Sequence, residues 1–233
     1  MPLIEESKYR SPLWLRNGHI ATLYPSMFRK VDGIQYNRER INTPDKDFLD
    51  IDWIVNDSHN LIIISHGLEG SSERPYVKGM AKLFSENDWD VLAWNCRSCS
   101  GEMNLQKRLY HHGTTDDLKT VVDHAISRGY QNIALAGFSM GGSMTVKYLG
   151  ENKNSLPDSV LGGVVFSVPI DLGGSSRQLE KSGNQIYMKR FLRKLSAKLE
   201  LKNQQFPGLV DLGKLDSITT FTEFDNTYTA PLY

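Results

Sequence analysis

Buried strands and helices alternate along residues 61–168, and this alternation limits the fold more than any other feature of the sequence. The apolar run Leu61–Ile64 is typical of a strand that is buried on both faces. A helix is expected at 114–128, and Gly129 follows it where a C-terminal cap glycine is common. Because alternating strands and helices form parallel sheets with right-handed crossovers, the sequence predicts an α/β fold with a mostly parallel sheet and helices on both faces.

The remaining elements follow from the same patterns. The expected strands lie at 61–65, 90–94, 133–136 and 160–168, and the expected helices at 75–86, 114–128 and 140–149. Residues 34–43 and 48–56 predict an additional hairpin, because the second segment alternates and turn residues separate the two. After residue 170 the alternation stops, and 178–202 looks helical. We therefore expect a core at 1–170 and a partial helical lid at 171–233.

A Gly-x-Ser-x-Gly motif at Gly137–Gly141 is the strongest candidate for chemistry. The motif begins where one expected strand ends and stops where a helix begins, which is the setting that a nucleophilic serine requires. Gly137 and Gly141 leave room for a tight turn, and Ser139 would stand at the positive end of the helix. The alternative is a glycine-rich turn in which Ser139 only caps the helix.

The loop His66–Ser71 follows the expected strand at 61–65. Acyl transfer needs two backbone N–H groups that point at the developing oxyanion. Met140 follows the candidate nucleophile, and Leu68 lies in this earlier loop, so these two residues are the expected donors. His66 precedes the motif, and we interpret it, with Gly67, as support for the loop rather than as the catalytic base.

Composition excludes several function classes. The 27 basic and 27 acidic residues balance, which gives no reason to expect a nucleic-acid partner. Neither a signal peptide nor a transmembrane segment is expected, and with two cysteines a cytoplasmic location is the default. Residues 177–202 carry eight Lys or Arg and two Glu. A solvated helix face explains this charge, and contact with an anionic membrane surface is the alternative.

The two cysteines form a C-x-x-C pattern, Cys96 to Cys99. A redox motif would need a helix to begin there, and a zinc site would need two further ligands, for which His111 and His112 are the nearby candidates. We interpret Cys96 and Cys99 as ordinary loop thiols, and no metal site is expected.

Several segments resemble, in order, the YheT-like branch of the α/β-hydrolases, called AB-hydrolase family 4. Leu15–Ile20 resembles the family's W-L-x-x-G-H-L segment, and Cys99–Glu102 resembles its R-G-C-S-G-E loop, with Ser98 in place of a glycine. Tyr110, His111 and Asp116–Leu118 resemble a Y-H-S-G-x-T-D-D-L stretch. The resemblance implies hydrolysis of a small-molecule carboxylic ester of short-to-medium acyl length, or acyl transfer to an alcohol. It implies an acyl-enzyme on Ser139 and no metal or organic cofactor.

The family's catalytic aspartate and histidine would lie beyond Tyr233, so the resemblance implies a C-terminally truncated chain that lacks the last strands of the sheet. All six histidines precede Ser139, whereas α/β-hydrolases order the triad as Ser, acid and His. This 233-residue chain is therefore expected to assemble no triad and to be inactive by itself. The alternative to an esterase is a non-catalytic fragment or a binding protein.

Overall fold

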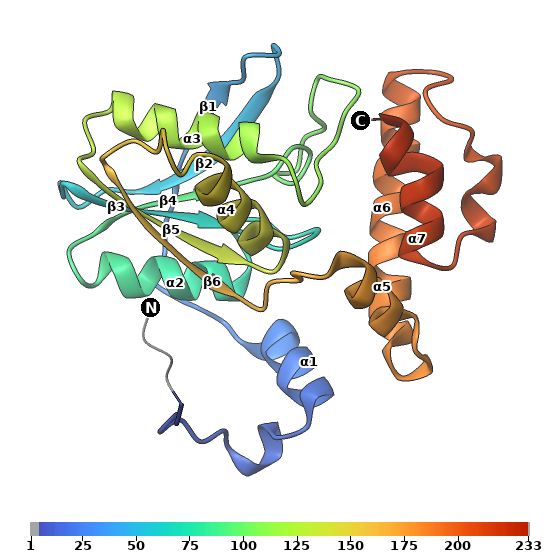
Figure 1. Ribbon diagram of the computed structural model, residues 1–233, viewed down its shortest axis with the longest axis horizontal. Coiled ribbons are helices and arrows are strands. Elements are labelled where there is room, and N and C mark those ends of the chain that lie inside the picture. Colours follow the sequence, from blue (N-terminus) through green and yellow to red (C-terminus); the bar gives the residue numbers. More distant parts are fainter. Residues whose placement is uncertain (1–4, 233) are drawn as a thin grey trace.

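A computed structural model describes residues 5–232 and contains one six-stranded mixed sheet in the order β1-β2-β4-β3-β5-β6 (Figure 1). The strands are β1 (Asn37–Asn42), β2 (Phe48–Ile54), β3 (Asn60–Ser65), β4 (Asp90–Trp94), β5 (Asn132–Phe138) and β6 (Val160–Phe166). The hairpin β1–β2 and the pair β2–β4 are antiparallel, whereas β4, β3, β5 and β6 are parallel. The predicted hairpin and parallel strands are confirmed.

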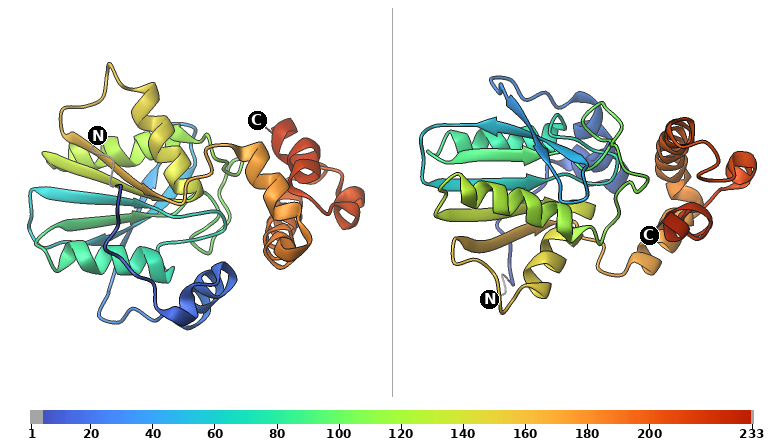
Figure 2. Two further views of the ribbon diagram at one scale, coloured as in Figure 1. Left: turned by 60° about the horizontal axis from the view of Figure 1, so that its bottom comes forward. Right: turned by 90° about the horizontal axis from the view of Figure 1, so that it is seen from above.

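Helices cover both faces of the sheet (Figures 1 and 2). The α-helices of the described residues are α1 (Gly18–Phe28), α2 (Pro75–Ser85), α3 (Thr115–Ser127), α4 (Met140–Glu151), α5 (Leu172–Glu180), α6 (Gln185–Gln205) and α7 (Phe221–Phe224), of which α2, α3 and α4 cover the sheet. Helix α2 packs on one face, where Val77 and Ala81 are fully buried with Ile62 and Ile64. Helices α3 and α4 cover the other face, where a larger apolar cluster forms.

The α3 region shows how the sequence specifies one of these layers. Leu118, Val121, Val122 and Ala125 recur at helical spacing, and all four are fully buried against the sheet. Gly129 has a φ of +92° directly after the helix, so its predicted role as a C-terminal cap is confirmed.

The segment after β6 is helical and packs on a separate apolar cluster (Figure 1). Met188, Leu192 and Leu199 of α6 are buried there with Phe224 and Tyr228. The helix predicted for 178–202 is confirmed in type, but the structure divides it, because α5 ends at Glu180 and α6 begins at Gln185. Helix α6 then contacts the loops at the carboxyl ends of the parallel strands.

Strand β6 forms an edge of the sheet among the described residues, where it pairs with β5 alone. The side chains of Leu161, Val164 and Phe166 on this strand are 61%, 46% and 38% exposed. An apolar edge strand of this kind is a site where further backbone can pair.

Candidate active site

Ser139 lies on a sharp turn between β5 and α4. Strand β5 ends at Phe138, helix α4 begins at Met140, and Ser139 between them has φ 52° and ψ −117°. A non-glycine residue in this region of φ/ψ space costs about 1–3 kcal/mol and persists only where the surroundings enforce it. Ser139 is solvent-exposed, so its hydroxyl is accessible at the N-terminus of α4.

The two glycines of the motif are required by close backbone approach. A Cβ on Gly141 would lie 2.5 Å from the His66 carbonyl oxygen and would also overlap the Ser65 carbonyl. A Cβ on Gly137 would lie 2.6 Å from Gly142 Cα. Helix α4 therefore packs against the end of β3, and this contact holds the turn that presents Ser139.

Gly141→Ala is expected to destabilise the fold by about 1–3 kcal/mol, because the added methyl group must displace backbone atoms. The matched control is Gly150→Ala in the same helix, where no atom lies within 4 Å of the new Cβ. The control should gain up to about 1 kcal/mol from helix propensity. Urea unfolding of both variants measures the difference, and equal midpoints would contradict the packing argument.

The loop His66–Ser71 lies directly beside Ser139. A Cβ on Gly67 would be 3.2 Å from Ser139 Cβ, so a glycine at this position lets the loop approach Ser139 without steric crowding. Within residues 5–232, the amide N–H groups of Leu68 and Met140 have no hydrogen-bond acceptor. Two unsatisfied N–H groups near an exposed serine hydroxyl are the arrangement from which an oxyanion hole is built.

The His66 side chain supports this loop through two hydrogen bonds. The Cys96 N–H donates to Nε2 at 3.1 Å, so the proton is on Nδ1, which donates to the Gly67 carbonyl at 2.7 Å. The side chain is 1% exposed, and burial lowers the pKa of His66 to about 4. His66 is thus a neutral side chain with both ring nitrogens occupied, as expected for a residue that supports the loop.

The His66 pKa gives a testable pH dependence. The folded pKa lies below the ordinary value of 6.5, so the unfolded chain binds more protons between these values. Stability is therefore expected to fall by about 3 kcal/mol as the pH decreases from about 6.5 to about 4. His66→Gln keeps one donor and one acceptor and should flatten this part of the curve. An unchanged pH dependence of unfolding in the variant would contradict the assignment.

A base for Ser139 is not supplied by the described residues. Between residues 5 and 232, the Ser139 hydroxyl forms no hydrogen bond to a side chain. His112 Nδ1 lies 3.5 Å from Ser143 Oγ, one turn after Ser139. His111 Nδ1 accepts the Gly113 N–H, and burial lowers the pKa of both His111 and His112.

A cleft of about 640 Å³ separates α4 from the helical segment. Its walls include Ser143 and Val146 of α4, Val168 and Ile170 after β6, and Asp225 beyond α7. The lining is mostly apolar, with histidines 111 and 112 at one side. Ligand sites are typically concave and apolar with a few polar groups, and this cleft has the size and lining of such a site.

Glu69 joins the loop beside Ser139 to helix α6. Its carboxylate Oε1 accepts from Lys198 Nζ at 2.7 Å and from the Tyr110 hydroxyl at 2.5 Å, and its side chain is only 8% exposed. Its carbonyl accepts from Lys194 at 3.2 Å and from Arg74 at 2.9 Å. With a φ of 53°, Glu69 is another strained residue that its surroundings hold in place.

Three lysines of α6 form one stripe toward the core. Lys194 and Lys198 bind Glu69, and Lys202 donates to the carbonyls of Asn104 and Gln106 at 2.7 and 2.8 Å. The interpretation of 177–202 as a solvated basic face is wrong for Lys198 and Lys202, which are 8% and 0% exposed. Their spacing of four residues was visible in the sequence, but their partners are 96 to 129 residues away in the chain.

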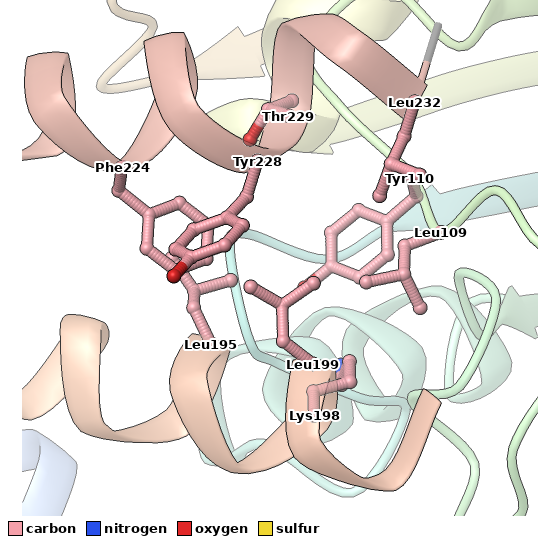
Figure 3. A pocket seen from close by; sticks show the side chains of 9 residues that line it. All are labelled: Leu109, Tyr110, Leu195, Lys198, Leu199, Phe224, Tyr228, Thr229 and Leu232. Atoms are coloured by element: carbon pink, nitrogen blue, oxygen red, sulfur yellow. The ribbon is translucent and has the colours of Figure 1, made fainter. Parts of the chain in front are cut away.

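Next to this stripe, α6 and the C-terminal residues enclose an apolar void (Figure 3). Leu195 and Leu199 of α6 face Phe224 and Tyr228 across it, and Tyr110 of the core lies at its side. The void is about 30 Å³, which is enough for water but too small for a larger ligand. The contact between α6 and the core is therefore closely packed on this side.

Cys96 and Cys99 are free thiols, and burial raises the pKa of both. Between them lies Arg97, which is fully buried and binds Asp47 at 2.7 Å and Asp117 through two bonds of 2.7 and 2.8 Å. Among the residues described, no three His, Cys, Asp or Glu side chains are grouped as metal ligands. The C-Arg-Ser-C loop thus carries a buried ion-pair network that the sequence pattern did not reveal.

No helix within residues 5–232 combines the length and apolar character that a membrane span requires.

Comparisons with known proteins agree with this geometry. Residues 56–212 match the family described as "Serine aminopeptidase, S33". The chain is 31% identical to "Putative esterase YheT" of Escherichia coli (strain K12) over 224 residues, 93% of this chain and 65% of that protein. It is 28% identical to human "Phospholipase ABHD3" over 244 residues, 100% of this chain and 59% of that protein. The chain thus spans less than two thirds of either relative.

A solved structure shows the same fold. The Pyrococcus furiosus esterase Pf2001 superposes with a TM-score of 0.54 at 24% identity, over 67% of this chain and 60% of that one. Because the S33 family matches well over half of the sequence, this chain belongs to the serine aminopeptidase S33 (Hydrolase_4) family of α/β-hydrolases, in its YheT-like branch.

Proposed function

We propose that the protein is a serine hydrolase that cleaves carboxylic esters of short-to-medium acyl length through an acyl-enzyme on Ser139. The observation that carries the proposal is the strained Ser139 turn, with φ 52° and ψ −117°, at the N-terminus of α4. Backbone strain at an exposed serine between a strand and a helix is typical of a nucleophile held ready for chemistry.

In this proposal Ser139 Oγ attacks the acyl carbonyl, and the N–H groups of Leu68 and Met140 bind the oxyanion. The Gly67 backbone beside Ser139 supports this placement, as does the hydrogen-bonding of His66 to the same loop. The alcohol leaves, and water or a second alcohol then releases the acyl group from Ser139. The apolar cleft beside Ser143 would receive the acyl chain.

Deprotonation of Ser139 needs a base, and none of the described residues bonds its hydroxyl. We propose that the natural protein supplies the triad acid and histidine from sequence after Tyr233. A polypeptide of residues 1–233 would then accelerate ester hydrolysis only through its oxyanion hole and substrate binding. The expected rate is roughly 10³–10⁴-fold above that of the uncatalysed reaction in water. In this proposal residues 171–233 form a lid over the site. The alternative function is a non-catalytic fragment or a binding protein.

The substrate class is tested with the natural protein and p-nitrophenyl esters of increasing acyl length, beside aminoacyl p-nitroanilides. We expect ester hydrolysis with a maximum at short or medium chains and little cleavage of the anilides. Cleavage of the aminoacyl anilides with no ester hydrolysis would replace the proposal by a peptidase function.

A further inference from the structure

Helix α1 is apolar and lies outside the core. Residues Gly18–Phe28 contain no Asp, Glu, Lys or Arg, and none of them is buried. Figures 1 and 2 show α1 projecting beside the sheet and its covering helices rather than packing between them. A helix that belongs to a folded core normally buries an apolar stripe, so α1 needs another explanation.

The exposed apolar side chains of this region are large and adjacent in sequence. They are Leu13 (75%), Trp14 (53%), Ile20 (45%), Tyr24 (44%), Met27 (66%) and Phe28 (61%). Trp14 contacts Tyr24 at 4.7 Å between ring centroids, and Tyr24 contacts Phe28 at 5.2 Å, so three aromatic rings form one cluster. Exposed apolar patches of this kind mark contact surfaces.

The charges next to α1 in the sequence are mostly basic, and the exposed acidic residues Glu5, Glu6 and Asp32 lie just outside residues 7–31. Residues 7–31 contain Lys8, Arg10, Arg16, Arg29 and Lys30, which are all exposed, and no acidic residue. The ring of His19 in α1 stacks on Tyr187 of α6 and lies 2.8 Å from its hydroxyl. This contact brings α1 next to the start of α6.

The first turns of α6 also expose an apolar side chain and several basic ones. Ile186 is 60% exposed, and Lys189, Arg190 and Arg193 are exposed as well. Unlike Lys198 and Lys202, these cations do not point into the core. They make the start of α6, which contacts α1 through Tyr187, basic as well.

We propose that α1 with the preceding Leu13 and Trp14 forms a membrane-binding surface for anionic lipid. Tryptophan and tyrosine favour the level of the lipid headgroups, and flanking lysine and arginine bind anionic headgroups. The helix lies in the plane of the interface, with its aromatic cluster inserted at the headgroup–acyl boundary. A second copy of this surface is disfavoured as the occupant, because an isologous contact would bring basic residues together. The proposal does not depend on Ser139.

The test is co-sedimentation of the full chain with phosphatidylcholine vesicles, either pure or with about one third phosphatidylglycerol. We expect binding that requires the anionic lipid and weakens with salt. Neutralising Arg16 and Lys30 (Arg16→Gln, Lys30→Gln) should lower the partition coefficient about fivefold for each residue. The triple variant Trp14→Ser, Tyr24→Ser, Phe28→Ser should lose at least about tenfold.

Matched controls are Leu83→Ser on α2, where the side chain is 56% exposed, and Lys153→Gln in the α4–β6 loop, which is also exposed. Both should bind vesicles as the unchanged protein does. Because every residue changed is exposed, circular dichroism should show an intact fold throughout.

Four results would overturn the proposal. The first is absence of binding to anionic vesicles, and the second is equal binding by the triple variant and the Leu83→Ser control. The third is self-association in sedimentation velocity that the triple variant abolishes while vesicles remain unbound, which would make a second copy the occupant. If the natural protein fails to bind while residues 1–233 bind, another part of the protein covers α1, and the proposal is equally wrong.

Discussion

Ser139→Ala in the natural protein should lower kcat for ester hydrolysis by about 10⁶-fold, the loss seen when a serine protease loses its nucleophile. The reason is that no acyl-enzyme can form, so only binding and oxyanion stabilisation remain. The Ser139 hydroxyl forms no hydrogen bond within residues 5–232, and the N–H groups of Leu68 and Met140, the proposed oxyanion donors, do not depend on it. The fold should therefore be retained, which circular dichroism would verify.

The matched control is Ser143→Ala, one turn further along α4. Ser143 faces His112 at 3.5 Å and lines the cleft, so it is the alternative hydroxyl for the same chemistry. We expect this variant to keep kcat within about tenfold, since one weak hydrogen bond is lost. A large loss of kcat in Ser143→Ala, with activity retained in Ser139→Ala, would show that Ser143 and not Ser139 is the nucleophile.

Lys198→Ala should destabilise the protein by about 3–5 kcal/mol, the usual cost of removing one partner from a buried ion pair. The change leaves the Glu69 carboxylate buried, with Tyr110 as its remaining partner. Because Glu69 belongs to the loop beside Ser139, the loss should loosen that loop as well as the contact with α6. The measurement is urea unfolding at pH 7, followed by fluorescence.

Lys189→Ala is the control for this prediction, because the same helix carries Lys189 on its exposed side. Its effect should be within about 0.5 kcal/mol. The double variant Glu69→Gln, Lys198→Met leaves neither charge of this pair buried, and it should recover part of the stability. Equal unfolding midpoints for Lys198→Ala and Lys189→Ala would show that the pair does not hold α6 to the loop.

The sheet and its parallel strands could be predicted because their signal is local. Apolar runs such as Leu61–Ile64 and Val91–Trp94 become strands that are buried on both faces. The motif at Ser139 was recognisable for the same reason, since the strand, the turn and the helix are consecutive in the chain. The interpretation of His66 as a support for its loop followed from its place before the motif.

Features that depend on distant partners were not visible in the sequence. Lys198 is 129 residues from Glu69, and only the folded chain shows that a basic segment supplies a buried ion pair. Helix α1 was not predicted, because its apolar residues do not follow the stripe of a core helix. Its N-terminus did carry a signal, since the Asn17 side chain accepts the N–H groups of His19 and Ile20.

Labelling with a fluorophosphonate is the measurement that tests the role of Ser139 most directly. The reagent reacts with an activated serine, and mass spectrometry of the digested protein then identifies the modified residue. We predict one adduct in the natural protein, on the peptide that contains Ser139, and none in the Ser139→Ala variant. An adduct on Ser143, or ester hydrolysis that persists in a protein with Ser139 fully labelled, would contradict the assignment.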